Sequence, residues 1–236
     1  MNDQRSPLGY AGGTASAPLI LDAAQRNRVL RNTYWLLAIS LVPTVLGAWI
    51  GVTTGIVTAM SPGISLMVFL VGAFGLMFVV NKTKNSATGV VALLAFTFFM
   101  GLMLSRLIAM VLGFRNGGTL VMTAFGGTAA IFFCMATMAT VIKRDLSGLG
   151  KFLMVGAWIL LFAFLANFFL QSSALMLTLL VVCLGLFSAF LLYDIRRVID
   201  GGETNYITAT LAIYLDLYNI FQSLLSLLGI FGGSSD

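Results

Sequence analysis

Seven long apolar runs constrain the fold of this chain more than any other feature. Each run is long enough to cross the hydrocarbon layer of a bilayer as a helix of about 20 residues. None shows the alternation of apolar and polar residues that is typical of strands, so helices are the expected spanning elements. The expected spans are 33–55, 62–80, 88–110, 119–142, 151–170, 174–197 and 207–231.

The composition indicates the same class of protein. Only 9% of the 236 residues are charged and 59% are hydrophobic, whereas soluble domains carry roughly 25% charged residues. So few charges could not cover a water-facing surface. We therefore expect one all-α integral membrane domain over residues 23–232, preceded by a flexible cytoplasmic tail over residues 1–22 that is rich in Gly, Ala, Ser and Pro.

The basic residues predict the orientation of the bundle. Seven spans place every Lys and Arg on one side except Arg106 and Arg115, and basic residues gather on the cytoplasmic side of membrane proteins. We expect a cytoplasmic N-terminus, a periplasmic C-terminus, and an Arg106 side chain that extends toward the outer interface. No basic stripe with interleaved aromatic residues is present, so nucleic acid is not an expected partner.

Some chemistries are excluded by the residue types that the chain contains. It has no histidine, which removes the commonest metal ligand and proton carrier and excludes Ser-His hydrolases and zinc–histidine sites. The two cysteines, Cys134 and Cys183, lie inside apolar runs. We expect both to be buried thiols that act as small hydrophobic side chains.

Two acidic residues lie at membrane depth, where an ionisable group costs several kcal/mol and is a functional candidate for that reason. Asp194 lies near the inner end of the sixth span and Asp216 lies within the seventh. Two antiparallel helices hold these residues at equal depth if the turn centres near residue 205, and the glycine-containing stretch 201–205 breaks the helices there. The two carboxyl groups are therefore expected to face each other.

The seventh span carries a stripe of polar and small residues at spacings of three and four, which places them on one helix face. In lipid, such a stripe must face other helices or water. We therefore expect a bundle of seven transmembrane helices with the semi-polar C-terminal helix at its centre. The stripe consists of Asn205, Thr208, Ala212, Asp216, Asn219, Ser223 and Ser226.

The acid pair has a plausible ion chemistry. Two carboxyl groups held close in a low dielectric cannot both ionise easily, so they can share a proton. When deprotonated, Asp194 and Asp216 offer oxygen ligands to a hard cation such as Ca²⁺. Asn219 and Arg197 are expected to support the pair.

Simpler interpretations of these residues stay open. Asp194 could cap its own helix or pair with Arg197, while Asp216 hydrogen-bonds inside the bundle. Lys82 and Lys84 could reach an inward-facing carboxylate, or they could only anchor the inner end of the second helix.

Several short motifs resemble one known family. The block IDGGETNYI at residues 199–207, with LYNIF at residues 217–221, resembles the bacterial YccA-like branch of the Bax inhibitor-1 (transmembrane Bax inhibitor motif) family. Shorter pieces add to the likeness, and it extends from about residue 28 to residue 230. These pieces are VLRNTY at 29–34, SPG at 61–63, GLMF at 75–78 and AFT at 95–97.

The resemblance implies a semi-polar seventh helix enclosed by the other six. The family's pH-sensing aspartates would correspond to Asp194 and Asp216, where they would govern a proton-sensitive leak of Ca²⁺. A basic residue near the inner end of the second helix would latch the closed state, and Lys82 and Lys84 lie there. The YccA-like branch also implies binding to the membrane AAA protease FtsH, with the N-terminal tail exposed to that protease.

The main functional hypothesis is therefore a pH-sensitive Ca²⁺ leak channel of the bacterial inner membrane, gated by the aspartate pair. The alternative is a regulatory membrane protein that binds and modulates FtsH. An intramembrane aspartyl protease is disfavoured, because Asp216 lacks the glycine-flanked context of such enzymes. We expect no enzymatic activity and no resident cofactor, and the expected partners are the lipid bilayer, Ca²⁺, protons and FtsH.

Overall fold

The computed structural model describes residues 23–142 and 146–233. This part of the chain contains no strand and forms seven helices that are long and apolar enough to span a membrane. The prediction of an all-α bundle of seven membrane helices is confirmed. The helices are α1 (Ala23–Thr54), α2 (Pro62–Thr83), α3 (Ala87–Leu112), α4 (Gly117–Val141), α5 (Ser147–Leu170), α6 (Ser173–Ile199) and α7 (Tyr206–Gly232).

The first helix is longer than the first predicted span. α1 begins at Ala23 rather than near residue 33, so the segment that carries Arg26, Arg28 and Arg31 is helical. Hydropathy marks only the membrane-embedded part of a helix, whereas α1 continues beyond it because Val29 packs against Val198 and Ala209. The predicted flexible tail, residues 1–22, lies outside the described residues.

Side chains at the helix starts explain where several loops end. Ser61 accepts a hydrogen bond from the backbone N–H of Ile64 and precedes Pro62, the first residue of α2. Ser172 accepts from the N–H of Leu175 at the start of α6. Such caps satisfy backbone donors that have no partner within the helix.

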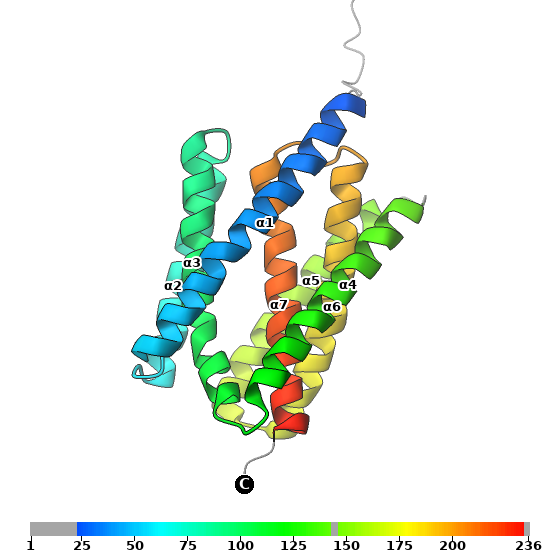
Figure 1. Cartoon of the computed structure of the whole chain (residues 1–236). Coiled ribbons are helices and arrows are strands. Elements are labelled where there is room, and N and C mark those ends of the chain that lie inside the picture. The colour runs from blue at the N-terminus through cyan, green and yellow to red at the C-terminus, as the bar shows by residue number, and fades with distance from the viewer. Residues whose placement is uncertain (1–22, 143–145, 234–236) are drawn as a thin grey trace, which may run out of the picture.

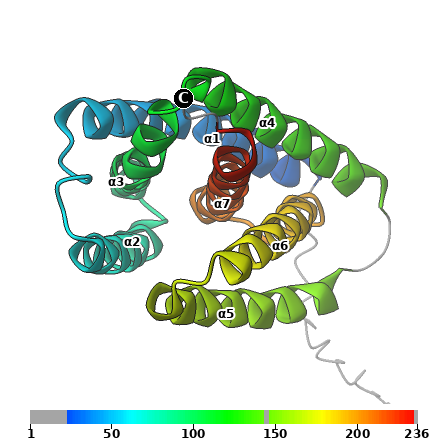
Figure 2. The same ribbon diagram turned by 90° about the horizontal axis from the view of Figure 1, so that it is seen from below.

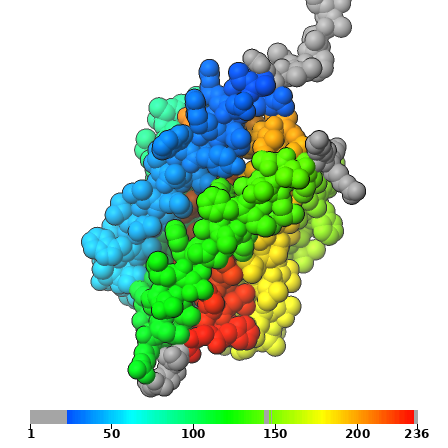
Figure 3. All heavy atoms as spheres, turned by 45° about the vertical axis from the view of Figure 1, so that its right-hand side comes forward, coloured from blue at the N-terminus to red at the C-terminus, as the bar shows by residue number. Residues whose placement is uncertain are grey.

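α7 occupies the centre of the bundle. Figure 2 shows it surrounded by other helices, and it packs against α1, α3, α4 and α6 and more weakly against α2. α5 is the exception to the enclosure that the resemblance implied. In the described part of the chain it packs only against α6 and does not reach α7. In Figure 3, α1 and α4 lie across one face of the molecule, and the C-terminal part of α7 is visible below α4.

Buried hydrogen bonds attach α7 to its neighbours. The Tyr214 hydroxyl lies 2.9 Å from the Thr44 hydroxyl of α1 and donates to the Thr97 carbonyl of α3 at 3.4 Å. One turn closer to the start of α7, the Thr210 hydroxyl lies 3.3 Å from the Thr33 carbonyl of α1. These bonds satisfy polar groups that cannot reach water, so they fix α7 against α1 and α3.

The cysteines differ from each other. Cys183 is buried, as expected, and interacts with Ser223 of α7. Cys134 on α4 is exposed, so its prediction as a buried thiol is wrong. An apolar run in lipid can turn any of its faces outward, which makes burial hard to predict from hydropathy alone.

Candidate functional site

The structure brings the two membrane-depth acids together. Asp194 lies toward the end of α6 and is half-buried, whereas Asp216 lies in the middle of α7 and is 3% exposed. Their carboxyl groups are close enough to act on each other's charge. Two carboxyl groups held together in a buried site do not both ionise easily, which makes the pair a candidate for sharing a proton.

Asp216 has few polar neighbours. Its Oδ2 atom is buried and has no hydrogen-bond partner in the described part of the chain. Tyr214, Tyr218 and Ile220 on the same helix are also buried. A carboxylate is costly in such surroundings, since burial without compensating partners penalises the charged form.

Asp194 lies at the border between this apolar interior and the α6–α7 loop. Arg197 and Glu203 both act on its charge. Arg197 makes its ion pair with Glu203, at 3.6 Å between Nη2 and Oε2. Glu203 also accepts hydrogen bonds from the N–H groups of Thr204 and Asn205 through Oε1, each at 3.0 Å. The sequence analysis considered Arg197 but missed Glu203, whose place in the GGETN turn was the available signal.

The other residues expected to support the pair make no hydrogen bond or ion pair with it among the described residues. The Asn219 side chain donates to the Leu215 carbonyl of its own helix at 2.8 Å. Lys82 and Lys84 are exposed, and among the described residues neither forms an ion pair with an acid. The expected basic latch at the end of α2 is therefore not formed in this structure.

Hydrogen bonds connect the loops at this end of the bundle, and Figure 1 shows the start of α1, the α2–α3 loop and the α6–α7 loop at the same end. Asn205 caps α7 by accepting from the N–H groups of Ile207 and Thr208. Its Nδ2 donates to the Lys84 carbonyl and to Asn85 Oδ1, both at 2.9 Å. The loop that follows α6 is thereby tied to the loop that follows α2.

A second set of contacts ties α6 to α4 at the same end. Arg196 donates to Asp200 Oδ2 at 2.7 Å and to the Ala139 carbonyl near the end of α4 at 3.1 Å. Together with the Asn205 contacts, this bond makes the end of the bundle a connected surface rather than a set of independent loops.

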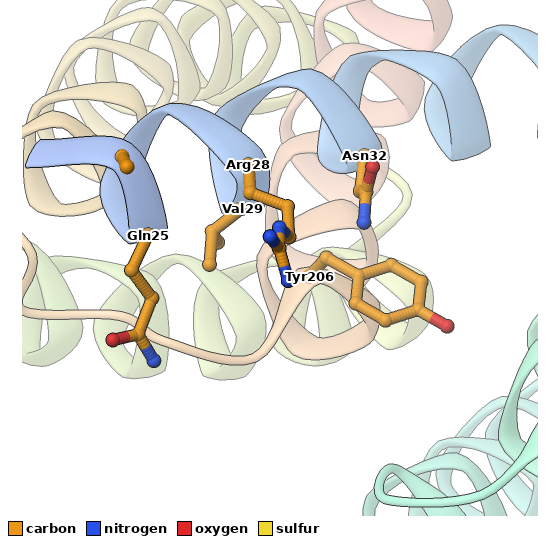
Figure 4. Close-up of a pocket in the computed structure, with 6 residues that line it drawn as sticks. Gln25, Arg28, Val29, Asn32 and Tyr206 are labelled. Carbon is orange, nitrogen blue, oxygen red and sulfur yellow. The ribbon is translucent and has the colours of Figure 1, made fainter.

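This end also carries a pocket of about 470 Å³ between the start of α1 and the start of α7. Figure 4 shows Gln25, Arg28 and Asn32 on α1, with Val29 between them and the Tyr206 ring below. The pocket is therefore polar and basic on the α1 side. Among the described residues, no hydrogen bond or ion pair joins its lining residues to Asp194 or Asp216.

A resident metal centre is not formed by these residues. Ca²⁺ takes about 6–8 oxygen ligands, and the described residues contain no group of three or more His, Cys, Asp or Glu side chains that could hold a metal.

Six apolar helices packed around or beside a semi-polar central helix, with two acids meeting between α6 and α7, define a polytopic membrane protein with an acid pair inside its bundle. The family model described as "Inhibitor of apoptosis-promoting Bax1" matches residues 26–233, which include nearly all of the described helical bundle. The chain belongs to the Bax inhibitor-1 family.

Curated relatives agree with this assignment. The "Modulator of FtsH protease YccA" of Escherichia coli K12 is 41% identical over 203 residues, covering 86% of this chain and 90% of that protein. The "Inner membrane protein YccA" of another E. coli strain is identical to the same extent. An uncharacterised Pseudomonas aeruginosa protein is 40% identical over 87% of this chain and 90% of its own length. None of these relatives carries an enzyme's name. The similarity to an inner membrane protein and the seven apolar helices make the present protein a multi-pass protein of the inner membrane.

Proposed function

We propose that this protein regulates an FtsH-type protease in the inner membrane. The observation that carries the proposal is the 41% identity to a protein named as a modulator of that protease, over 86% of the chain. The match extends over most of the chain, so the proposal does not depend on the similarity of a single helix or loop.

The connected end of the bundle is the surface that suits this role best. Binding costs less when the surface is ordered beforehand. At this end, Asn205 ties the α6–α7 loop to the α2–α3 loop, and Arg196 ties α6 to the end of α4. We place this end in the cytoplasm, because it carries the basic loops.

Reconstitution with the protease tests the proposal. FtsH should co-purify with the full-length protein, and it should degrade a membrane substrate more slowly when the protein shares its vesicles. Loss of both effects on deletion of residues 1–20, with retention in Asp194→Asn and Asp216→Asn, would assign the contact to the tail and cytoplasmic surface. Co-purification that depends on the acids would contradict the proposal.

A second candidate function is a pH-sensitive cation leak, which the buried acid pair favours. In this proposal, a proton shared by Asp194 and Asp216 holds α6 against α7 and closes the inner end. Loss of the proton leaves two negative charges side by side, which repel each other, loosen the helix pair and admit a cation such as Ca²⁺. The better-buried Asp216 is the residue expected to keep the proton.

Ca²⁺ flux into vesicles, measured against pH, tests this second function. The wild type should show pH-dependent flux, and Asp194→Asn and Asp216→Asn should each abolish the dependence. Asp200→Asn is the matched control, since this exposed acid of the same end pairs with Arg196 and is not part of the acid pair. An unchanged pH profile in both pair variants would contradict the gating mechanism without touching the protease proposal.

A further inference from the structure

A pocket on the opposite half of the bundle contains polar side chains that neither proposed function uses. It has a volume of about 650 Å³ and lies between α3 and α7 under the α1–α2 loop. Figure 2 shows α2 beside α3, with α7 at the centre of the bundle. The lining residues that matter are Met103, Arg106, Leu107 and Met110 of α3, Gln222 of α7, and Thr58 of the loop.

Two polar groups of this pocket lie at membrane depth. With a rise of about 1.5 Å per residue, Arg106 lies roughly 9 Å before the end of α3 at Leu112. Gln222 lies about 15 Å before the end of α7 at Gly232. The ends of these helices meet, because Asn116 donates to the Gly232 carbonyl at 2.6 Å. Both side chains are therefore below the membrane surface, with Arg106 closer to it.

These groups face outward rather than into the protein. Gln222 is exposed and Arg106 is half-buried. One guanidinium N–H of Arg106 donates to the Met60 carbonyl at 3.3 Å, which holds the side chain under the loop. No acidic side chain in residues 23–142 or 146–233 pairs with Arg106. An amide and a cation that face hydrocarbon are costly unless a polar group meets them.

We propose that this pocket binds one phospholipid of the outer leaflet. Its phosphate lies on the Arg106 guanidinium, an ester carbonyl accepts from the Gln222 amide, and an acyl chain lies along Met103, Leu107 and Met110. The order of depth agrees with lipid structure, because the ester groups of a phospholipid lie below its phosphate. Charge complementarity supports the same occupant, since guanidinium binds phosphate oxygens through paired hydrogen bonds.

A lipid fits this pocket better than a partner helix. A phospholipid carries its anion directly above an apolar chain and already surrounds the protein. A transmembrane helix would need an acidic residue at the same depth, which carries its own cost. The site is also distinct from the acid pair, since neither Asp194 nor Asp216 lines it.

Native mass spectrometry of the full-length protein in mild detergent tests the site, with phosphatidylethanolamine and phosphatidylglycerol as probes. The wild type should retain one lipid more tightly than the rest. Arg106→Gln should weaken that binding about tenfold, which corresponds to about 1.4 kcal/mol, and Gln222→Leu should weaken it severalfold. The matched control Arg115→Gln, which changes an exposed arginine at the same end and outside the pocket, should bind as the wild type does.

Three outcomes would overturn the proposal. The first is equal lipid retention in the wild type, Arg106→Gln and Gln222→Leu. Gln222→Leu keeps this result meaningful even if the arginine variant misfolds, since it replaces an exposed amide by an apolar group. The second is displacement of the lipid by millimolar inorganic phosphate, which would make the pocket a phosphate site. The third is a photo-crosslink from benzoylphenylalanine at Met110 to a polypeptide instead of a lipid, which would make the pocket a helix-docking site.

Discussion

The contact between α1 and α3 gives the most exact prediction about stability. The two helices approach each other at Gly101, where an added Cβ would meet the carbonyl group of Thr44. That Cβ would lie 2.7 Å from the Thr44 carbonyl carbon and 2.9 Å from its Cα, whereas carbon atoms pack at about 3.5–4.0 Å. Gly101→Ala therefore has to separate the helices by about 0.8 Å or more at this point.

The separation also affects the central helix. The Thr44 hydroxyl lies 2.9 Å from the Tyr214 hydroxyl of α7, and a shift of that size would lengthen the bond beyond hydrogen-bonding distance. Overpacking costs about 1–3 kcal/mol and loss of the hydrogen bond about 1 kcal/mol. We expect a total of about 2–4 kcal/mol and a fall in Tm of about 5–15 °C.

Heating in detergent, followed by size-exclusion chromatography of the surviving monomer, measures this change. Gly75→Ala is the matched control, because a Cβ at Gly75 would meet no atom within 4 Å and alanine favours the helix. Its Tm should be unchanged or slightly higher. A change of 1 kcal/mol should shift the Tm of a chain of this size by about 2–4 °C. A Gly101→Ala protein with a Tm within about 2 °C of the wild type would therefore refute the reasoning.

Three further predictions concern α7 and its contacts. Tyr214→Phe should cost about 0.5–1.5 kcal/mol and should be less than additive with Thr44→Val in thermal unfolding, whereas full additivity would show that the two hydroxyls do not interact. Asn205→Ala removes both the α7 cap and the tie to the α2–α3 loop, so it should cost about 0.5–2 kcal/mol and speed hydrogen exchange in both segments. Unchanged exchange in the α2–α3 loop would contradict the tie. Asp216→Asn keeps the side-chain volume and removes the charge. Ca²⁺ flux should rise with pH in the wild type and should not change with pH in this variant. A variant whose flux rises with pH as in the wild type would exclude the gate.

Much of the fold could be predicted because lipid leaves the backbone few choices. Long apolar runs must be helices in a bilayer, and the polar stripe through Asp216 placed α7 at the centre. The pairing of Asp194 with Asp216 followed from the position of the turn near residue 205. These features depend on the spacing of polar residues and helix breaks along the chain, which can be read from the sequence.

The remaining features depend on which helices pack against each other, and the periodicity of a sequence does not predict those pairs. Tyr214 lies in an apolar run, so its bonds to Thr44 and Thr97 had no signal before the packing was known. α5 has no distinct polar face, so its position outside α6 could not be distinguished from a position against α7. The partner of Arg197 was missed for a related reason, since Glu203 comes within reach only through the conformation of the loop.

The most direct test of the protease proposal is the rate at which FtsH degrades a membrane substrate in vesicles that contain increasing amounts of this protein. We predict that degradation slows as the amount of protein rises, and vesicles with E. coli YccA, the protein named as a modulator of FtsH, serve as the comparison. A constant rate with this protein, alongside a clear effect of YccA, would contradict the proposal.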